Sequence, residues 1–407
     1  MGNDLAARGR FFAAAGARLL YAAVLAGALL AGCGGSGGSS TPPEPPAEVV
    51  LPPVTTAAVG VTQTANLAVD QYMQGQLVAQ RIPGATVVVV KEGQVIYARG
   101  YGYANLASAL PVKSEDRFEI GSITKSFAAS AIMLLVQDGK MSLDDKLEKH
   151  IEGSPAQWSG ITIRQVLNHT AGIQRDADEA TLKAVASNQV IGQDVLLARI
   201  KGYPLTGAPG AKFSYSNVGY YLIGFVIRKV SGKHYFDFLQ ERVFTPLGMR
   251  TARLIAPNLS SVDYASGYTI ENNRRVAVRL TDAQLLGLSL AAGGIQLSAM
   301  DMAKWDAALY TEKMLKKESL DLMWTNSALV QAASGTEPDV YYGLGWQLRT
   351  QGDVRWVYHS GGMPGHVSEM IRYPEKKLTV IVLLNLDGNA NPRIIGRSVA
   401  RLFDPAL

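Results

Sequence analysis

The 407-residue sequence contains one cysteine, Cys33, and only five histidines. A single cysteine excludes an intrachain disulfide and a metal cluster held by several cysteines. No two histidines stand in the H-x-x-x-H spacing of zinc hydrolases, so we expect no metal site and no cofactor. The net charge of +5 is small for this length and forms no basic stripe, which argues against nucleic acid as a partner.

The chain starts with a basic segment followed by an apolar one. Arg8, Arg10 and Arg18 precede an apolar run over residues 19–32. The run has about 14 residues, fewer than the roughly 20 that span a bilayer, and its basic flank is typical of a signal peptide. The alternative is an uncleaved anchor helix, which Arg18 would interrupt. We therefore expect residues 1–32 to be a signal peptide and the protein to be exported.

Cys33 ends this segment in the run Leu-Ala-Gly-Cys, which resembles a bacterial lipoprotein signal. The resemblance implies lipidation of Cys33 and a membrane anchor on the periplasmic or cell-envelope face. Gly34 in the next position favours the outer membrane if the cell is Gram-negative. Residues 33–62 are rich in Gly, Ser and Pro and predict a linker. Their G-x-S-x-G run over 34–38 lacks the flanking strand and helix of a nucleophile elbow, so no catalytic serine is expected there.

Residues 63–407 predict the folded region, without a long linker or an internal repeat. A helical pattern covers 65–80, and strands rich in β-branched residues, 85–91 and 95–101, flank a Glu-Gly turn. The pattern over 118–290 is mostly helical. The end of the chain returns to strands at 354–359, 366–373 and 378–385. We expect an α/β fold whose antiparallel β-sheet, flanked by helices, is built from both chain ends (63–117 and 291–407), with the helical part 118–290 inserted.

Ser122 and Lys125 form an S-x-x-K motif just before an apolar helical segment, 126–137. Residues three apart share a helix face, so the hydroxyl and the amine are expected to lie together. A serine hydroxyl needs a base to become a nucleophile, and a buried lysine with a lowered pKa can supply one. The backbone N–H of Ser122 at a helix start suits an oxyanion. A helix-capping serine followed by a surface lysine would give the same three-residue spacing.

A second motif, Tyr215-Ser216-Asn217, precedes another apolar helical segment, 218–230. A tyrosine beside a lysine can relay protons. Asn217 has an oxygen that can accept from the lysine and an NH₂ group that can donate to a substrate carbonyl. Tyr103-Ala104-Asn105 has the same Y-x-N pattern, but it lies at the exit of a predicted strand, and we interpret it as structural.

The third motif, His359-Ser360-Gly361, ends the predicted strand that begins at residue 354. A strand edge with a cation, a hydroxyl and a glycine suits an extended acyl substrate, so we expect all three residues to bind substrate. His359 would be a titratable donor for a substrate carboxylate. The N–H of Gly362 is expected to complete an oxyanion hole with that of Ser122. A histidine in an edge turn is the alternative for this motif alone.

Together the three motifs, in the order S-x-x-K, Y-x-N and H-x-G, resemble the serine β-lactamase superfamily in its class C branch. That branch includes D-alanyl-D-alanine carboxypeptidases, D-aminopeptidases and esterases. Further similar segments are 167–173, 246–249, 292–294, 342–346 and 359–366. The resemblance implies a β-lactamase/transpeptidase-like fold and a mechanism in which Ser122 attacks the carbonyl, Lys125 and Tyr215 carry protons, and Asn217 orients substrate and lysine. Which of Lys125 and Tyr215 is the formal base stays open.

The motif set implies a serine hydrolase that cleaves an amide or ester through an acyl-Ser122 intermediate, and the predicted signal peptide implies that it is exported. Dedicated class C β-lactamases carry lysine where this chain has His359, so the resemblance favours a carboxypeptidase-like enzyme acting on a peptidoglycan-type peptide. Three alternatives remain: a β-lactamase, a carboxylesterase for short acyl esters, and a penicillin-binding protein with little turnover. His169 is interpreted as a structural residue under the active-site helix.

Overall fold

The computed structural model describes residues 63–186, 192–255, 263–278, 290–335, 337–388 and 390–407. The expected signal peptide (1–32), Cys33 and the linker (33–62) lie outside these residues, so the lipid anchor stays a prediction. Within the described part of the chain, no helix is long and apolar enough to cross a membrane.

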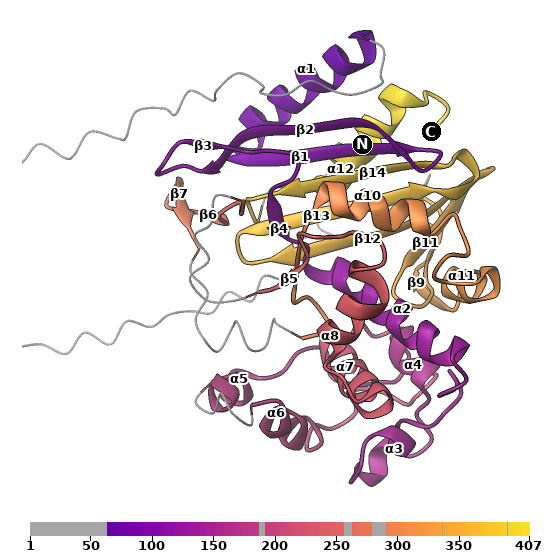
Figure 1. Cartoon of the computed structure of the whole chain (residues 1–407). Helices are drawn as coiled ribbons and strands as arrows, with labels where there is room; N and C mark the ends of the chain where they lie inside the picture. The colour runs from indigo at the N-terminus through magenta and orange to yellow at the C-terminus, as the bar shows by residue number, and fades with distance from the viewer. Residues whose placement is uncertain (1–62, 187–191, 256–262, 279–289, 336, 389) are drawn as a thin grey trace, which may run out of the picture. The chain divides into compact units, whose positions relative to one another are not determined.

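A nine-stranded antiparallel sheet forms the centre of the folded region (Figure 1), in the order β3-β2-β1-β14-β13-β12-β11-β10-β9. The first long strand of the chain, β1, pairs with the last, β14, and Ala85 stands opposite Leu384. The predicted sheet built from both chain ends is therefore confirmed. The strands are β1 Gly84–Lys91, β2 Gln94–Asn105, β3 Leu110–Pro111, β9 Ala328–Gln331, β10 Val340–Tyr342, β11 Gln347–Gln351, β12 Val354–Met363, β13 His366–Tyr373 and β14 Leu378–Leu384.

The β1–β2 hairpin shows how the sequence specifies this sheet. Its two turn residues, Glu92 and Gly93, have φ values of 53° and 76°. Two left-handed residues form the tight turn whose twist matches antiparallel strands. The run of four valines in β1 is buried because neighbours cover both faces of this central strand.

Four strands of the sheet, β3, β9, β10 and β11, are absent from the sequence-based prediction, which had five strands. They have between two and five residues each. Alternation over so few positions does not distinguish a strand from a loop.

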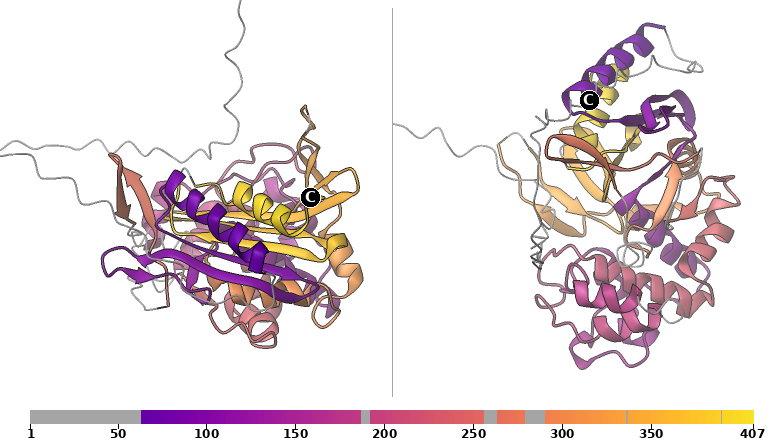
Figure 2. Two further views of the ribbon diagram at one scale, coloured as in Figure 1. Left: turned by 90° about the horizontal axis from the view of Figure 1, so that it is seen from above. Right: turned by 90° about the vertical axis from the view of Figure 1, so that its left-hand side faces the viewer.

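Helices cover both faces of the sheet. On one face α12 (Pro392–Phe403) packs against β13 and β14, and α1 (Gln63–Ala79) lies beside α12 (Figure 2). On the other face Asp306 of α10 (Ala299–Ala308) accepts a hydrogen bond from Thr379 of β14 at 2.7 Å. The same carboxylate pairs with Arg372 at 2.6 Å, and both side chains are buried. Side chains alternate between the two faces of a strand, so each strand residue faces either the α12 layer or the α10 layer.

The segment between the two sheet-forming ends is mainly helical. Its buried centre is α2 (Thr124–Gln137), packed against α7 (Asn217–Ser231). Ser216 caps α7 by accepting from the N–H of Gly219, and Gly232, with φ 74°, ends it. Other elements here are α3 Leu147–His150, η2 Ala156–Trp158, α4 Ile163–Leu167, α5 Glu179–Ala186, α6 Gly192–Ile200, α8 Tyr235–Leu239 and the π-helical turn η3 Gln240–Phe244.

Short strands also occur here and were not predicted. β4 (Arg117–Glu119), β8 (Ile295–Ser298) and β5 (Arg253–Leu254) form a small sheet, and β6 (Tyr268–Glu271) pairs with β7 (Arg274–Ala277). β8 lies between β4 and β5. The strand just before the helical segment, β4, is therefore hydrogen-bonded to the strand just after it, β8. The remaining helical elements are α11 (Lys317–Met323) and η4 (Pro374–Lys376).

Candidate active site

Ser122 lies in a single 3-10 turn, η1 (Gly121–Ile123), which leads directly into α2. Gly121 has φ +52°, and a Cβ there would lie 2.7 Å from the backbone nitrogen of Gly362. Only glycine allows both this backbone conformation and this close approach. The turn therefore sits directly against β12, and the Ser122 side chain stays partly exposed.

Lys125, one turn further along, is completely buried. Its Nζ lies 3.1 Å from Ser122 Oγ, 2.8 Å from Asn217 Oδ1 and 2.7 Å from the carbonyl oxygen of Ala292. Burial holds the pKa of this amine well below its usual range. The alternative of a helix-capping serine with a surface lysine is therefore wrong.

Tyr215 and Asn217 come to the same point from the start of α7. Lys125 Nζ lies 4.8 Å from the centroid of the Tyr215 ring. The pKa of the phenol is raised by burial, and its hydrogen bond with the Ser122 side chain lowers it by less. Asn217 uses its oxygen for Lys125 and donates from Nδ2 to Asp176 Oδ1 at 2.6 Å. Lys125 thus contacts Ser122, Tyr215 and Asn217, and the last two come from a segment about 90 residues further along the chain.

The rival Y-x-N motif lies elsewhere. Tyr103 and Asn105 belong to β2, where they pair with β3. Asn105 donates to Ser266 Oγ at 3.2 Å. The lysine-contacting asparagine is Asn217, as the sequence analysis preferred.

The structure corrects the expectation for His359. The residue is 1% exposed, with Nε2 2.9 Å from the hydroxyl of Tyr342 and Nδ1 2.7 Å from the carbonyl oxygen of Ser360. Burial, and then the nearby Lys125, lower the pKa of His359 to about 3. The ring is therefore neutral at ordinary pH, and its two nitrogens have partners within the protein. It does not offer a cation to a substrate carboxylate.

Ser360 is also placed differently from the expectation. Its hydroxyl donates to Glu369 and accepts from Arg393 Nη2 at 2.6 Å. Arg393 belongs to α12, and Ser360 stands opposite Glu369 in the β12–β13 register. Because strand residues alternate, the Ser360 side chain is on the α12 face of the sheet, and Ser122 is on the other.

Gly361, which ends the third motif, and Gly362, which follows it, lie next to the turn Gly121–Ile123 that carries Ser122 (the nucleophile turn). A Cβ on Gly361 would lie 2.0 Å from the carbonyl oxygen of Ile120, so this position requires glycine. Gly362 is exposed, and its backbone nitrogen faces Gly121 closely. The backbone of residues 361–362 therefore reaches the site, whereas the side chains of His359 and Ser360 serve the interior of the protein.

Three contributors were missed by the sequence analysis. Asp176 and its neighbour Arg175 lie in the loop after α4, and the Arg175 guanidinium is 5.5 Å from the centroid of the Tyr215 ring. Ala292, in the A-G-G segment noted for its family resemblance, supplies a main-chain carbonyl to Lys125. A backbone carbonyl and a charged loop pair leave no periodic signal in a sequence.

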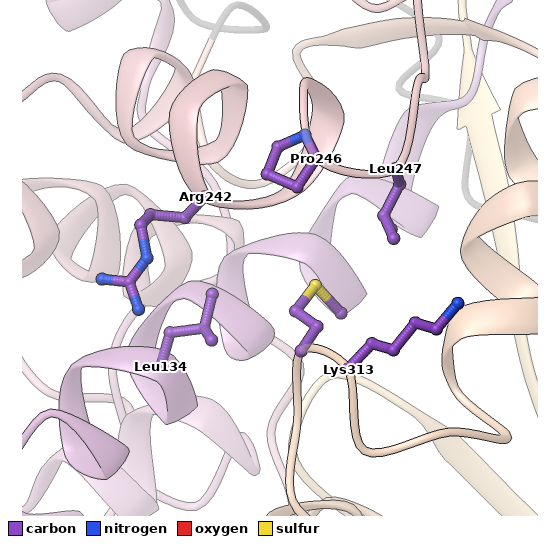
Figure 3. A pocket seen from close by; sticks show the side chains of 6 residues that line it. Leu134, Arg242, Pro246, Leu247 and Lys313 are labelled. Atoms are coloured by element: carbon purple, nitrogen blue, oxygen red, sulfur yellow. The ribbon is translucent and has the colours of Figure 1, made fainter.

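Neither a metal site nor the cavity of Figure 3 is an alternative candidate for the active site. In the described residues no group of three or more His, Cys, Asp or Glu side chains is arranged to hold a metal ion. The cavity, of about 290 Å³, contains no predicted site residue, and its Arg242 is paired with Asp138. It is lined by Leu134, Arg242, Pro246, Leu247, Lys313 and Met314.

A hydroxyl in contact with a phenol and with a buried amine, which an amide in turn holds in place, can form and break a covalent acyl ester. This group of side chains and the fold define a serine hydrolase of the β-lactamase/transpeptidase type. The chain belongs to the Beta-lactamase family, whose pattern matches residues 68–403.

Relatives agree with this assignment. Penicillin-binding protein 4* of Bacillus subtilis is 32% identical over 315 residues, which are 74% of this chain and 67% of that protein. The octameric penicillin-binding protein homologue from Pyrococcus abyssi has a TM-score of 0.73 at 28% identity. The match covers 83% of this chain and 77% of that chain. The D-amino acid amidase of Ochrobactrum anthropi has a TM-score of 0.69 at 25% identity, covering 84% and 97% respectively.

Proposed function

We propose that this protein is an exported acyl hydrolase that cleaves an amide or ester through a covalent acyl-Ser122 intermediate. Its substrate is a peptide of the peptidoglycan type that ends in D-alanine. The relatives named penicillin-binding protein support this substrate class, and so does the similarity to an amidase of D-amino acids. The predicted lipid anchor at Cys33 would hold the enzyme at the cell envelope, where such peptides occur.

The observation that carries the mechanism is the set of oxygens around Lys125 Nζ. Asn217 Oδ1 and the Ala292 carbonyl can only accept hydrogen bonds. A neutral amine has two N–H bonds and one lone pair. Because the two acceptors take the two N–H bonds, the lone pair is directed at the third neighbour, the hydroxyl of Ser122.

The perturbed pKa values favour Lys125 over Tyr215 as the first proton acceptor. Burial disfavours charge on both groups, which keeps the amine unprotonated and the phenol protonated. Ser122 Oγ bonds to the carbonyl carbon while its proton passes to Lys125. The leaving nitrogen or oxygen takes a proton from the Tyr215 hydroxyl as its bond to the carbonyl carbon breaks. Lys125 then gives Tyr215 the proton that it took from Ser122. Water then attacks the ester, the acid departs, and a proton returns to Ser122.

Main-chain N–H groups are proposed to stabilise the oxyanion. A Cβ on Gly121 would lie 2.7 Å from the backbone nitrogen of Gly362, so this nitrogen lies close to the turn that carries Ser122. Two N–H donors at such a position are worth several kcal/mol in the transition state, with about 3 kcal/mol for each.

A substrate panel on the purified mature enzyme tests the proposal. Fluorescent penicillin, nitrocefin, p-nitrophenyl butyrate and a peptide ending in D-Ala-D-Ala are each supplied to the wild type and to Ser122→Ala. We expect release of D-alanine and a stable mass increase on Ser122 with penicillin, both lost in the variant. Butyrate hydrolysis alone would indicate an esterase, and labelling without turnover a penicillin-binding protein. Reaction that persists in Ser122→Ala would refute the proposal.

A test of export is independent of the catalytic one. Processing of the full chain that is sensitive to globomycin, and is lost in Cys33→Ser, would support lipidation at Cys33. Processing that is unaffected by both would contradict it.

A further inference from the structure

Asp176 is linked to Lys125 through a single side chain. Its Oδ1 accepts from Asn217 Nδ2 at 2.6 Å, and the other end of the same amide, Oδ1, accepts from Lys125 Nζ at 2.8 Å. A carboxylate can only accept, so it fixes which end of the amide faces the lysine. If the amide turned around, its NH₂ group would point at the amine and compete with Ser122 for the lone pair.

The loop that carries Asp176 is held independently of its side chains. The carbonyl oxygen of Arg175 accepts from the backbone N–H of Asn217 at 2.7 Å and of Val218 at 3.2 Å. The side chains of Arg175 and Asp176 pair at 3.2 Å and are 66% and 56% exposed. Substitution of either side chain therefore leaves the backbone anchor on α7 in place.

The two neighbours act on Lys125 in opposite directions. After burial, the charge of Asp176 is the next largest influence and raises the pKa of Lys125, while Arg175 lowers it. The other titratable side chains that face this amine are neutral near pH 7. They are Tyr215 and Tyr220 on the α7 side, His169 after α4, and His359 on β12.

We propose that Asp176 is a positioning residue that orients Asn217 toward Lys125, and that the Arg175–Asp176 pair sets the pH range in which Ser122 is acylated. This inference rests on the proposed function and deepens it. Because the Arg175–Asp176 ion pair is exposed, either side chain can be substituted without disturbing the core.

The experiment measures the acylation rate of Ser122 against pH, at low salt, with a substrate from the panel that the wild type consumes. Asp176→Asn keeps an oxygen for Asn217 but removes the charge. We expect the acid limb of its profile to move down by about half a pH unit, since exposed charges are partly screened. Arg175→Gln is expected to move the limb up by a similar amount. Asp176→Ala also removes the acceptor, and we expect its maximal rate to fall about tenfold.

Glu179→Gln is the matched control, because Glu179 is an exposed carboxylate in the same segment that pairs with Lys183. Its profile is expected to overlay the wild type. If the acid limbs of the pH–rate profiles of Asp176→Asn and Arg175→Gln coincide, the inference is overturned while the proposed function stands. A wild-type rate that does not depend on Ser122 would remove the proposed function, and this inference with it.

Discussion

The imidazole of His169 lies against the phenol ring of Tyr215, with the ring centroids 4.3 Å apart. Nδ1 of His169 accepts from the backbone N–H of Ser216 at 3.1 Å. The residue itself has φ +62°, which is uncommon for anything but glycine. Burial, and then Lys125, hold the pKa of this imidazole well below its usual range, so the ring is neutral. His169 therefore holds Tyr215 through a ring contact and through a hydrogen bond to the backbone of the next residue.

Replacing His169 with alanine should slow acylation without removing the nucleophile. A loss on the order of 10²-fold is expected, because small displacements of a catalytic group have effects of that size. The rate is measured by stopped flow with the substrate that the wild type consumes. His169→Asn retains a hydrogen-bond acceptor and tolerates the left-handed backbone, so it should recover part of the rate. Equal rates for wild type and His169→Ala would show that the ring contact does not position Tyr215.

Lys125→Met should give an inactive protein that is more stable than the wild type. The buried amine is costly because an unfolded lysine is charged and solvated, while the folded one has its pKa lowered by burial. Below the pKa of the unfolded lysine, this pKa difference between the folded and unfolded states lowers the free energy of unfolding. Methionine does not titrate, so the variant is free of this cost. Asn217 and Ala292 lose a donor, which offsets part of the gain. We expect a net gain of about 1 kcal/mol or more at pH 7 in urea unfolding, with no labelling by penicillin. A less stable variant would contradict this.

The central strands and both catalytic helices could be predicted because they carry long, regular patterns. Four valines in succession predict β1, and the apolar run over 126–137 predicts α2, which ends just before Gly139 with its φ of +69°. The proximity of Ser122 and Lys125 also followed from spacing, because three residues make nearly one helical turn.

What failed concerns the direction of single side chains. Whether the side chains of His359 and Ser360 face a substrate depends on the strand register and on which layer covers each face of the sheet. A three-residue motif contains neither kind of information. The burial of His359 under Tyr342, and the pairing of Ser360 with α12, come from segments far away in sequence. The partner of Asn217, Asp176, is likewise set by the docking of a loop.

Gly361→Ala should destabilise the protein strongly, while Gly362→Ala should not. A Cβ at 361 meets the carbonyl oxygen of Ile120 at 2.0 Å and Ser368 Oγ at 2.2 Å, so β12 and the nucleophile turn must separate. A Cβ at 362 meets no atom within 4 Å. We expect a loss of about 2 kcal/mol or more at 361 and of less than about 0.5 kcal/mol at 362, measured by chemical unfolding. Similar losses at both positions would show that the turn does not rest on Gly361.

His359 should make the stability of the protein depend on pH. Its pKa is lowered to about 3 in the folded protein, mainly by burial, whereas an unfolded histidine has an ordinary value near 6.5. Between these two pH values the unfolded state binds a proton that the folded state does not. The free energy of unfolding therefore falls as the pH falls through this range, by at most about 1.4 kcal/mol per pH unit.

His359→Gln isolates this contribution, because glutamine can still bond to the Tyr342 hydroxyl but does not titrate. From pH 7 to pH 5 the wild type should lose about 2 kcal/mol more than the variant. The measurement is the difference between their urea unfolding free energies at each pH, in which the contributions of all other groups cancel. A difference that stays constant from pH 7 to pH 5 would mean that the buried ring takes up a proton as readily as a free one.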